Sequence, residues 1–197
     1  MRILHLNFDD SIGGASRAAI RLHKSLLLKK VKSRIIVIKK NNTERDVFKL
    51  KNNYDLLNFL KRLFSFILKN IQNFQKLDIH RSYNIFNNNE LVQYINNSNY
   101  DLVHLHWINS EMISIEDLIK INKKIIWTFH DLWPVLPTQH ITLKNNFNYL
   151  ANSGFENFFY NRKKNLFKKR KINIICPSNF IYKKIKNYKI IKKNRVK

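Results

Sequence analysis

The sequence predicts an α/β fold: one open, mostly parallel sheet with helices on both faces. Short apolar runs rich in β-branched residues alternate with longer segments that carry apolar residues at helical spacing. A glycine pair follows the first apolar run, where a strand passes into a helix. A length of 197 residues is typical of one domain, so we expect a single domain over residues 1–197.

The first forty residues have a strand–loop–helix–strand pattern. Arg2–Asn7 is an apolar-rich run and predicts a buried first strand. Apolar residues recur at helical spacing through Ala15–Lys30, and the β-branched run Arg34–Ile38 predicts a second strand. The polar stretch Lys39–Asn53 has no clear period, so no helix or strand is predicted there.

A basic amphipathic segment follows. Leu56–Leu77 has apolar residues every three or four positions and predicts one long helix or two short ones. Two interpretations stay open: the helix packs on its own domain, or it lies on a membrane surface. Four phenylalanines would form its lipid-facing side: Phe59, Phe64, Phe66 and Phe74.

The second half repeats strand–helix units. The predicted strands are Asp101–Trp107, Lys124–Phe129 and Ile172–Cys176, and the predicted helices lie near Ser114–Ile121, over Phe155–Arg170 and from Asn179 onward. Ser114 is expected to cap its helix, with Asp117 at the third helical position. The loop Leu132–His140, with two prolines, joins a strand to the next helix.

Composition narrows the function classes. Three Gly, three Pro and one Cys exclude collagen-like and disulfide-rich proteins. A net charge of +24 is typical of proteins that bind nucleic acid or anionic membranes. However, the abundance of Lys, Asn and Ile also fits an AT-rich genome, which places lysine on solvated faces without a ligand. We therefore expect no nucleic-acid partner, and keep salt-sensitive nucleic-acid binding as a third hypothesis.

Localisation is inferred from the same features. No apolar run reaches the ~18 residues that a spanning helix needs, and the N-terminal segment does not resemble a secretory signal. We expect a cytoplasmic protein. Peripheral contact with the inner face of the cytoplasmic membrane is the alternative, because Asn161–Lys197 has 15 basic residues and no acidic one.

Candidate ligand-binding residues follow the predicted strands. In open parallel sheets, ligands bind beyond the carboxyl ends of the strands. Four clusters are expected there: Asp9–Gly14, His106–Asn109, His130–Trp133 and Pro177–Ser178. Gly13 and Gly14 would let the backbone and the following helix N-terminus approach an anion, although a plain tight turn explains the pair equally well. Their spacing matches neither the dinucleotide fingerprint nor the P-loop.

The histidines suggest hydrogen bonding rather than metal chemistry. His104 and His106 are two positions apart on one strand and point to the same face of the sheet. They lack a convincing third ligand in the sequence, so no metal site is expected. His130 is well placed at a strand end to hydrogen-bond a substrate hydroxyl. No Ser–His–Asp or Cys–His order stands out, and Cys176 is interpreted as structural.

Several motifs occur in one order along the chain. They are Met1-Arg2-Ile3-Leu4-His5-Leu6-Asn7, Gly13-Gly14-Ala15-Ser16-Arg17-Ala18-Ala19 followed by Leu22-His23-Lys24, Asp101-Leu102-Val103-His104-Leu105-His106-Trp107-Ile108-Asn109, Ile126-Trp127-Thr128-Phe129-His130-Asp131-Leu132-Trp133-Pro134 and Pro177-Ser178-Asn179-Phe180. Together they resemble the N-terminal domain of family 4 glycosyltransferases. Within that family, the chain is most similar to bacterial enzymes that build exopolysaccharide, lipopolysaccharide or capsule chains.

The resemblance implies a GT-B architecture, in which two Rossmann-like domains face a cleft. The N-terminal domain receives a glycan or lipid-linked acceptor, and the C-terminal domain binds the nucleotide-sugar donor. Transfer with retention of configuration, without a metal or another cofactor, is the family expectation. His130 matches the histidine that contacts the transferred sugar, and Gly13 and Gly14 match the loop near the donor phosphates. The remaining predicted substrate-binding residues are placed in the cleft by position alone: Arg17, His106, Asn109, Asp131 and Ser178.

The chain also departs from the family pattern. It stops at Lys197, where the first domain would end, so we expect half of an enzyme that is inactive without a donor domain. A separate chain would supply that domain; the alternative is a non-catalytic truncated remnant that binds an acceptor or a partner. The cysteine-containing insert of related sequences has no cysteine in Pro134–Tyr149 here.

Overall fold

Seven parallel strands form one sheet in this computed structural model, which describes residues 1–197 except 50–58, 62, 68–79, 142–153, 187 and 192–193. The strand order is β3-β2-β1-β4-β5-β6-β7. The strands are β1 (Arg2–Leu6), β2 (Lys32–Val37), β3 (Val47–Lys49), β4 (Leu102–Leu105), β5 (Lys124–Thr128), β6 (Ile172–Ile175) and β7 (Arg195–Val196). The predicted α/β, Rossmann-like fold is confirmed.

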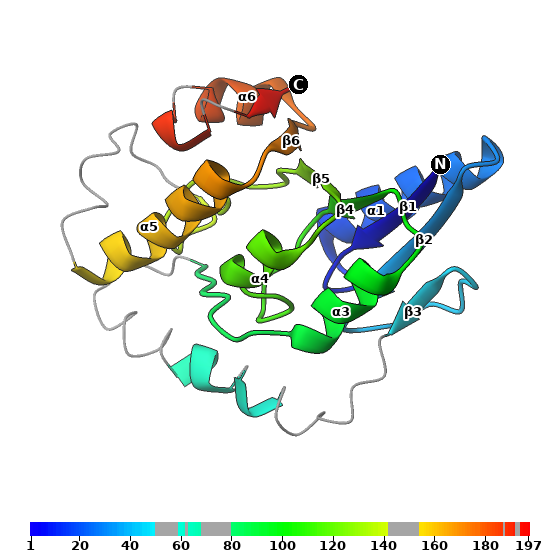
Figure 1. Cartoon of the computed structure of the whole chain (residues 1–197), viewed down its shortest axis with the longest axis horizontal. Coiled ribbons are helices and arrows are strands. Elements are labelled where there is room, and N and C mark those ends of the chain that lie inside the picture. The colour runs from blue at the N-terminus through cyan, green and yellow to red at the C-terminus, as the bar shows by residue number, and fades with distance from the viewer. Residues whose placement is uncertain (50–58, 62, 68–79, 142–153, 187, 192–193) are drawn as a thin grey trace.

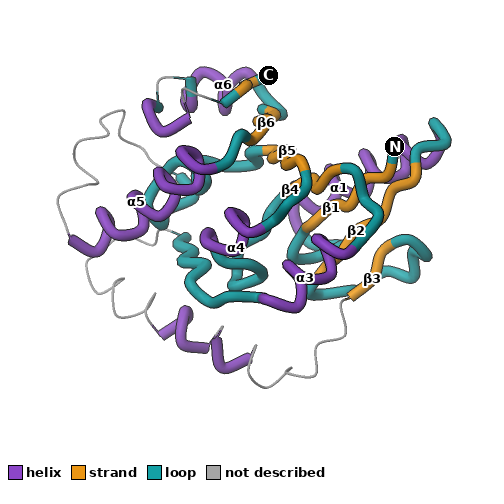
Figure 2. The backbone as a smooth tube through the Cα atoms, in the orientation of Figure 1, coloured by secondary structure: helices purple, strands orange, loops and turns teal. Residues whose placement is uncertain are grey.

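Helices cover both faces of the sheet (Figure 1). They are α1 (Gly13–Leu28), α3 (Asn89–Asn97), α4 (Ile115–Lys120), α5 (Gly154–Lys169) and α6 (Asn179–Ile185), with a 3₁₀ turn at Lys189–Ile191. In Figure 1, α3, α4 and α5 lie in front of the sheet and α1 lies behind it. The loops that join the strands to the helices can be followed in Figure 2.

For the predicted strands and for the helices near Ala15–Lys30, Ser114–Ile121 and Phe155–Arg170, the first and last residues agree with the structure to within two positions. Ser114 caps α4 as predicted, since its Oγ accepts a hydrogen bond from the Asp117 backbone N–H at 3.0 Å. Two short edge strands, β3 and β7, and the helix α3 were not predicted. The signal for α3 was present, because Leu91, Val92 and Ile95 have helical spacing and are buried.

Most of the predicted helix over Leu56–Leu77, including Phe74, lies outside the described residues. Residues 59–61 and 63–67 are helical. This piece contacts its own domain, because the Phe64 ring packs edge-on against Phe86 at 5.8 Å and Ser65 Oγ donates to Glu111 at 2.9 Å. Phe59 and Phe66 are exposed. Within the described residues, no helix has the length and apolar character needed to cross a bilayer.

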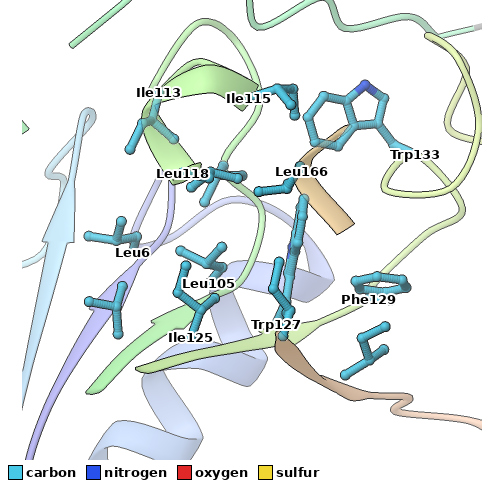
Figure 3. Close-up of a cluster of buried hydrophobic side chains, with 14 of the residues drawn as sticks. Leu6, Leu105, Ile113, Ile115, Leu118, Ile125, Trp127, Phe129, Trp133 and Leu166 are labelled. Carbon is cyan, nitrogen blue, oxygen red and sulfur yellow. The ribbon is translucent and has the colours of Figure 1, made fainter. Parts of the chain in front are cut away.

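One face of the sheet carries the main hydrophobic core. Alternate residues of the central strands point toward α4 and α5. Figure 3 shows strand residues such as Leu105 and Trp127 in one cluster with Leu118 and Leu166. The strand residues on this face are Leu4, Leu6, Val103, Leu105, Ile125, Trp127, Ile172 and Ile174. Each buried large apolar side chain contributes roughly 1.5–3 kcal/mol relative to exposure.

The opposite face is built differently. His5 of β1 and His104 of β4 are partners in register, and both side chains point away from the apolar core toward α1. His23 of α1 meets them there, with its ring 6.3 Å from the ring of His5. The α1 side of the sheet is therefore filled by histidines at the point where the apolar pattern is interrupted.

The two glycines at the start of α1 have different conformations, and this gives a testable difference in stability. Gly13 has a φ of +90°, which strains any L side chain, so Gly13→Ala should lower the free energy of unfolding by about 1–2 kcal/mol. Gly14 is the matched control, because a Cβ at either position meets nothing within 4 Å. Gly14→Ala should be neutral or stabilise by up to ~1 kcal/mol. Equal destabilisation of both variants in urea unfolding would contradict the backbone explanation.

Candidate functional site

A cavity of about 490 Å³ lies beyond the carboxyl ends of β1, β4 and β5. Segments far apart in the sequence line it: Phe8, Asp9, Ile12, Gly13, Gly14, Ala15, Ser16, Lys39, Trp107, His130 and Asp131. A larger cavity of about 730 Å³ lies at the other end of the strands, beside Arg2, Lys32 and Tyr100. Ligands of parallel sheets bind at carboxyl ends, and of these two cavities only the first contains predicted site residues, four of them.

The carboxylate of Asp9 stabilises the loop before α1. Asp9 Oδ1 accepts hydrogen bonds from the backbone N–H groups of Ser11, at 2.6 Å, and Ile12, at 2.8 Å. Burial raises the pKa of Asp9, but the hydrogen bonds from Ile12 and Ser11 lower it more, so the net pKa is below its usual value. Asp9 is therefore ionised at neutral pH and fixes the turn that leads into α1.

The N-terminus of α1 is open toward the cavity. The residue at the N-cap position is Ile12, and within the described residues no side chain caps the helix. The first turn contains no acidic residue, and Gly13, Gly14 and Ala15 line the cavity. Unpaired N–H groups and the helix dipole favour an anion at such an end. The exposed ammonium group of Lys39, 5.6 Å from the Phe8 ring centroid, adds a positive charge nearby.

His130 lies across the cavity from this helix end. It follows β5 directly, and its Nε2 is 3.2 Å from Nδ1 of His106. Burial lowers the pKa of His130, while the neighbouring Asp131 opposes the shift. The ring is therefore neutral at pH 7, and a neutral imidazole has one N–H donor and one acceptor nitrogen.

The family model of Glycosyltransferase Family 4 matches residues 12–197. The chain belongs to glycosyltransferase family 4. A crystal structure of a glycosyltransferase from Rickettsia africae ESF-5 is also similar, with a TM-score of 0.46 and 18% sequence identity. The alignment covers 100% of this chain and 41% of that chain. A search of curated proteins found no match.

The structure brings four of the predicted residues of this family 4 domain into one cavity: Gly13, Gly14, His130 and Asp131. The other four lie elsewhere. Arg17 is exposed on α1, and His106 is buried behind His130. Asn109 is only 2% exposed, and its Oδ1 has no hydrogen-bond partner among the described residues. Ser178 caps α6, where its Oγ accepts from the Ile181 N–H, and it lines a separate cavity of about 520 Å³.

Four residues that line the family 4 cavity lie outside the predicted clusters: Phe8, Ala15, Ser16 and Lys39. Trp107 belongs to the predicted cluster His106–Asn109 but was not named as a substrate-binding residue. Phe8 and Trp107 come directly after β1 and β4, and their rings meet edge-on at 5.7 Å. Their strand-end positions are the signal that could have identified them. The buried ring of Phe8 and the half-buried ring of Trp107 offer an apolar surface beside the polar groups, as ligand sites usually do.

Asp131, which lines the cavity, is linked to Ser82 through His140 by two hydrogen bonds, and we call these three residues the relay. His140 Nδ1 is 2.6 Å from Asp131 Oδ2, and His140 Nε2 is 2.9 Å from Ser82 Oγ. The sequence shows no Ser–His–Asp order; Asp131 and His140 belong to one loop, and the structure brings Ser82 to them from 58 positions before His140. Ser82 is buried, and Trp133 Nε1 donates to its carbonyl oxygen at 2.8 Å. Because only Asp131 of the three lines the cavity, the relay holds the loop that carries it.

Lys163 of α5 holds the same loop from below. Its Nζ donates to the carbonyl oxygens of Trp133 at 2.5 Å, Leu136 at 2.7 Å and Pro137 at 3.0 Å. It also lies 3.8 Å from the centroid of the Trp133 ring. One buried cation therefore satisfies three carbonyl groups of a loop that contains two prolines.

A cluster of three buried histidines supplies the third imidazole that the sequence lacked for a metal site. Ligand nitrogens of His5, His104 and His106 lie within 4.8 Å of one another. However, the rings of His104 and His106 stack at 4.3 Å with an interplanar angle of 27°. Both nitrogens of His106 already face other histidines, His5 at 3.1 Å and His130 at 3.2 Å. This arrangement favours a hydrogen-bonded cluster, and the absence of a resident metal stays a prediction.

Proposed function

We propose that this chain forms the acceptor-side half of a GT-B glycosyltransferase. The reaction is transfer of a sugar from a nucleotide-sugar donor to a glycan or lipid-linked acceptor in cell-surface polysaccharide biosynthesis. Family membership supports a glycosyltransferase in general. The observation that carries the finer proposal is the cavity in which the uncapped N-terminus of α1 faces a neutral histidine, His130.

Five of the lining residues have proposed roles. Gly13 and Gly14 approach the donor diphosphate, whose negative charge the helix end and Lys39 favour. His130 hydrogen-bonds an oxygen of the transferred sugar near the reaction centre. Trp107 offers its ring to an apolar sugar face. Such groups act most strongly when they stabilise charge that develops in the transition state.

A second set of roles depends on how far the ligand reaches. Contacts of Arg17, Asn109 or Ser178 with substrate require a ligand that extends beyond this cavity. Retaining, metal-independent transfer also requires positive groups on the departing diphosphate, which we assign to a donor domain. We propose that this domain faces the cavity, from further sequence or from a separate chain, at the inner face of the cytoplasmic membrane. Nucleic acid is not part of the proposal.

The proposal is tested by His130→Ala in the transferase purified from its native cell with any associated chain. Loss of one positioned hydrogen-bond donor should lower kcat by about 10²–10³-fold. The midpoint of thermal unfolding should change little, because the His130 ring is only partly buried. Turnover is followed by release of the nucleoside diphosphate.

Unchanged turnover of the His130→Ala variant would contradict the assignment of His130. A wild-type preparation that binds acceptor but never turns over donor would contradict the enzymatic proposal itself and support the non-catalytic binding module. The intact mass of the native protein complements this assay, because a mass above 23.8 kDa would identify further sequence as the source of the donor domain.

A further inference from the structure

Three histidines form a continuous chain from the protein interior to the cavity. His5 Nδ1 is 3.1 Å from His106 Nε2, and His106 Nδ1 is 3.2 Å from His130 Nε2. His5 is fully buried and His106 is 4% exposed, whereas His130 lines the cavity. Both ring nitrogens of His106 are thus used within this row of histidines, and Nδ1 of His130 makes no hydrogen bond to the part of the protein that the structure describes, so it can bind a ligand.

The hydrogen bonds among His5, His106 and His130 require neutral imidazole rings, and the surroundings of His5 and His106 keep these rings neutral. Burial, together with the neighbouring His104 and His23, lowers the pKa of His5 to about 3. Burial also lowers the pKa of His106 well below its usual value, with His104, His5 and His130 adding to the shift. Each ring at pH 7 therefore carries a single N–H, so each can donate one hydrogen bond and accept one.

Two proton arrangements satisfy both hydrogen bonds. In the first, His5 Nδ1–H donates to His106, and His106 Nδ1–H donates to His130. In the second, both bonds are reversed, which places a proton on His5 Nε2. That nitrogen is buried and has no hydrogen-bond partner among the residues that the structure describes. Buried N–H groups without an acceptor are rare in folded proteins, so the first arrangement is favoured.

We propose that His5 and His106 are positioning residues that fix His130 as the Nδ1–H tautomer. His130 then accepts from His106 through Nε2 and offers a proton donor to the cavity. The ligand group it recognises is an oxygen with a free lone pair, such as a sugar hydroxyl or a phosphate oxygen. The inference rests on the proposed function for its biological meaning, but its test needs no substrate.

Contacts outside the three rings hold His106 in place and occupy the neighbouring histidines. The backbone N–H of His106 donates to the Leu6 carbonyl at 3.0 Å, and its carbonyl accepts from Trp127 Nε1 at 3.3 Å. The His23 side chain beside His5 is already bonded to Ser33 Oγ at 2.7 Å. His104 bonds to Thr128 Oγ1 at 2.8 Å and takes no part in the chain. These anchors hold His106 between its two partners.

The test reads the tautomers directly. The whole protein is labelled with ¹⁵N-histidine. Two-bond ¹H–¹⁵N correlations at pH 7 then distinguish the Nδ1–H form of each histidine from the Nε2–H form. Wild-type His130 should carry its proton on Nδ1. His106→Phe keeps a ring of similar size but removes both hydrogen bonds, so His130 should shift toward the Nε2–H form that free histidine favours.

His104→Phe is the matched control. His104 is as buried as His106 and stacks on it at 4.3 Å, but it bonds to Thr128 instead of His130. The tautomer of His130 should not change in this variant. An Nε2–H form of His130 in the wild type would overturn the proposal, even if neither variant folds. An equal shift in both variants would also overturn it.

A metal centre would overturn the proposal in a different way. Stoichiometric zinc bound by the wild-type chain, and lost in His104→Phe, would mean that the ring nitrogens bind an ion instead of one another. Because no outcome depends on turnover, failure of this inference leaves the proposed transferase function standing. Failure of the transferase assay likewise leaves the tautomer measurement valid.

Discussion

Acidification from pH 7 to pH 5 should lower the free energy of unfolding by about 4 kcal/mol through two buried histidines alone. Burial lowers the pKa of His5 to about 3 and that of His104 to about 4, whereas an unfolded histidine titrates near 6.5. Between these values the unfolded chain binds protons that the folded chain does not. Each histidine therefore costs about 2 kcal/mol of stability by pH 5.

The direction of the change in the free energy of unfolding, and the pH range in which it occurs, identify the buried histidines as its cause. Stability rises with pH wherever the unfolded state binds more protons, so it should be lost as pH falls from about 6.5. The groups around His5 do not reverse this, because His23, His104 and His106 all have lowered pKa values. Asp9, whose pKa is also lowered, contributes stability that is lost only at lower pH, as the pH falls from the pKa of an unfolded carboxyl through the lowered pKa of Asp9.

Urea unfolding between pH 7.5 and 5 measures this dependence. His5→Phe removes one titrating ring, so its stability should fall by about 2 kcal/mol less than that of the wild type over the same range. A flat dependence in the wild type would mean that the α1 side of the sheet accepts charged histidines. The same dependence in both proteins would assign it to other groups.

Lys163→Met should lower the free energy of unfolding by about 3–5 kcal/mol. Lys163 is 1% exposed, and the substitution would leave three buried carbonyl oxygens without the donor that they share. Burial lowers the pKa of Lys163 well below its usual range, while Asp131 raises it. The ammonium form is favoured because only it has three N–H donors for three acceptors.

Lys164→Met is the matched control on the next position of α5. Lys164 is exposed, so its replacement should change stability by no more than about 0.5 kcal/mol. Chemical unfolding of the two variants gives the comparison. Equal stability of Lys163→Met and the wild type would mean that water or a rearranged loop satisfies the carbonyl groups of Trp133, Leu136 and Pro137.

The contact of Lys163 with the loop links stability to the site. The loop that it holds begins at Asp131, which lines the cavity. Loosening the loop should therefore reach Asp131 and His130 as well as the core around Trp133. In an active transferase, the Lys163→Met variant should lose turnover together with stability, whereas His130→Ala should lose turnover alone. Comparing the two separates a structural effect from a chemical one.

The sequence by itself determined the sheet, its main helices and part of the site. Strand and helix periods are local properties, so alternation along the chain was enough to predict parallel strands with helices between them. The carboxyl ends of parallel strands share one edge of the sheet. That rule alone placed Gly13, Gly14, His130 and Asp131 together, and the structure places all four in one cavity.

Only the tertiary structure determined which buried side chains hydrogen-bond to the site residues and to the loops that carry them. His5 and His106 are 101 positions apart, and Ser82 and His140 are 58 apart, so no local pattern indicates their hydrogen bonds. The same holds for Lys163, which looks like one member of a basic run until α5 packs on the loop. The edge strands β3 and β7 are likewise only three and two residues long, and they form because a neighbouring strand offers free backbone groups. Burial and pairing at long range, which no local period encodes, gave these residues their roles.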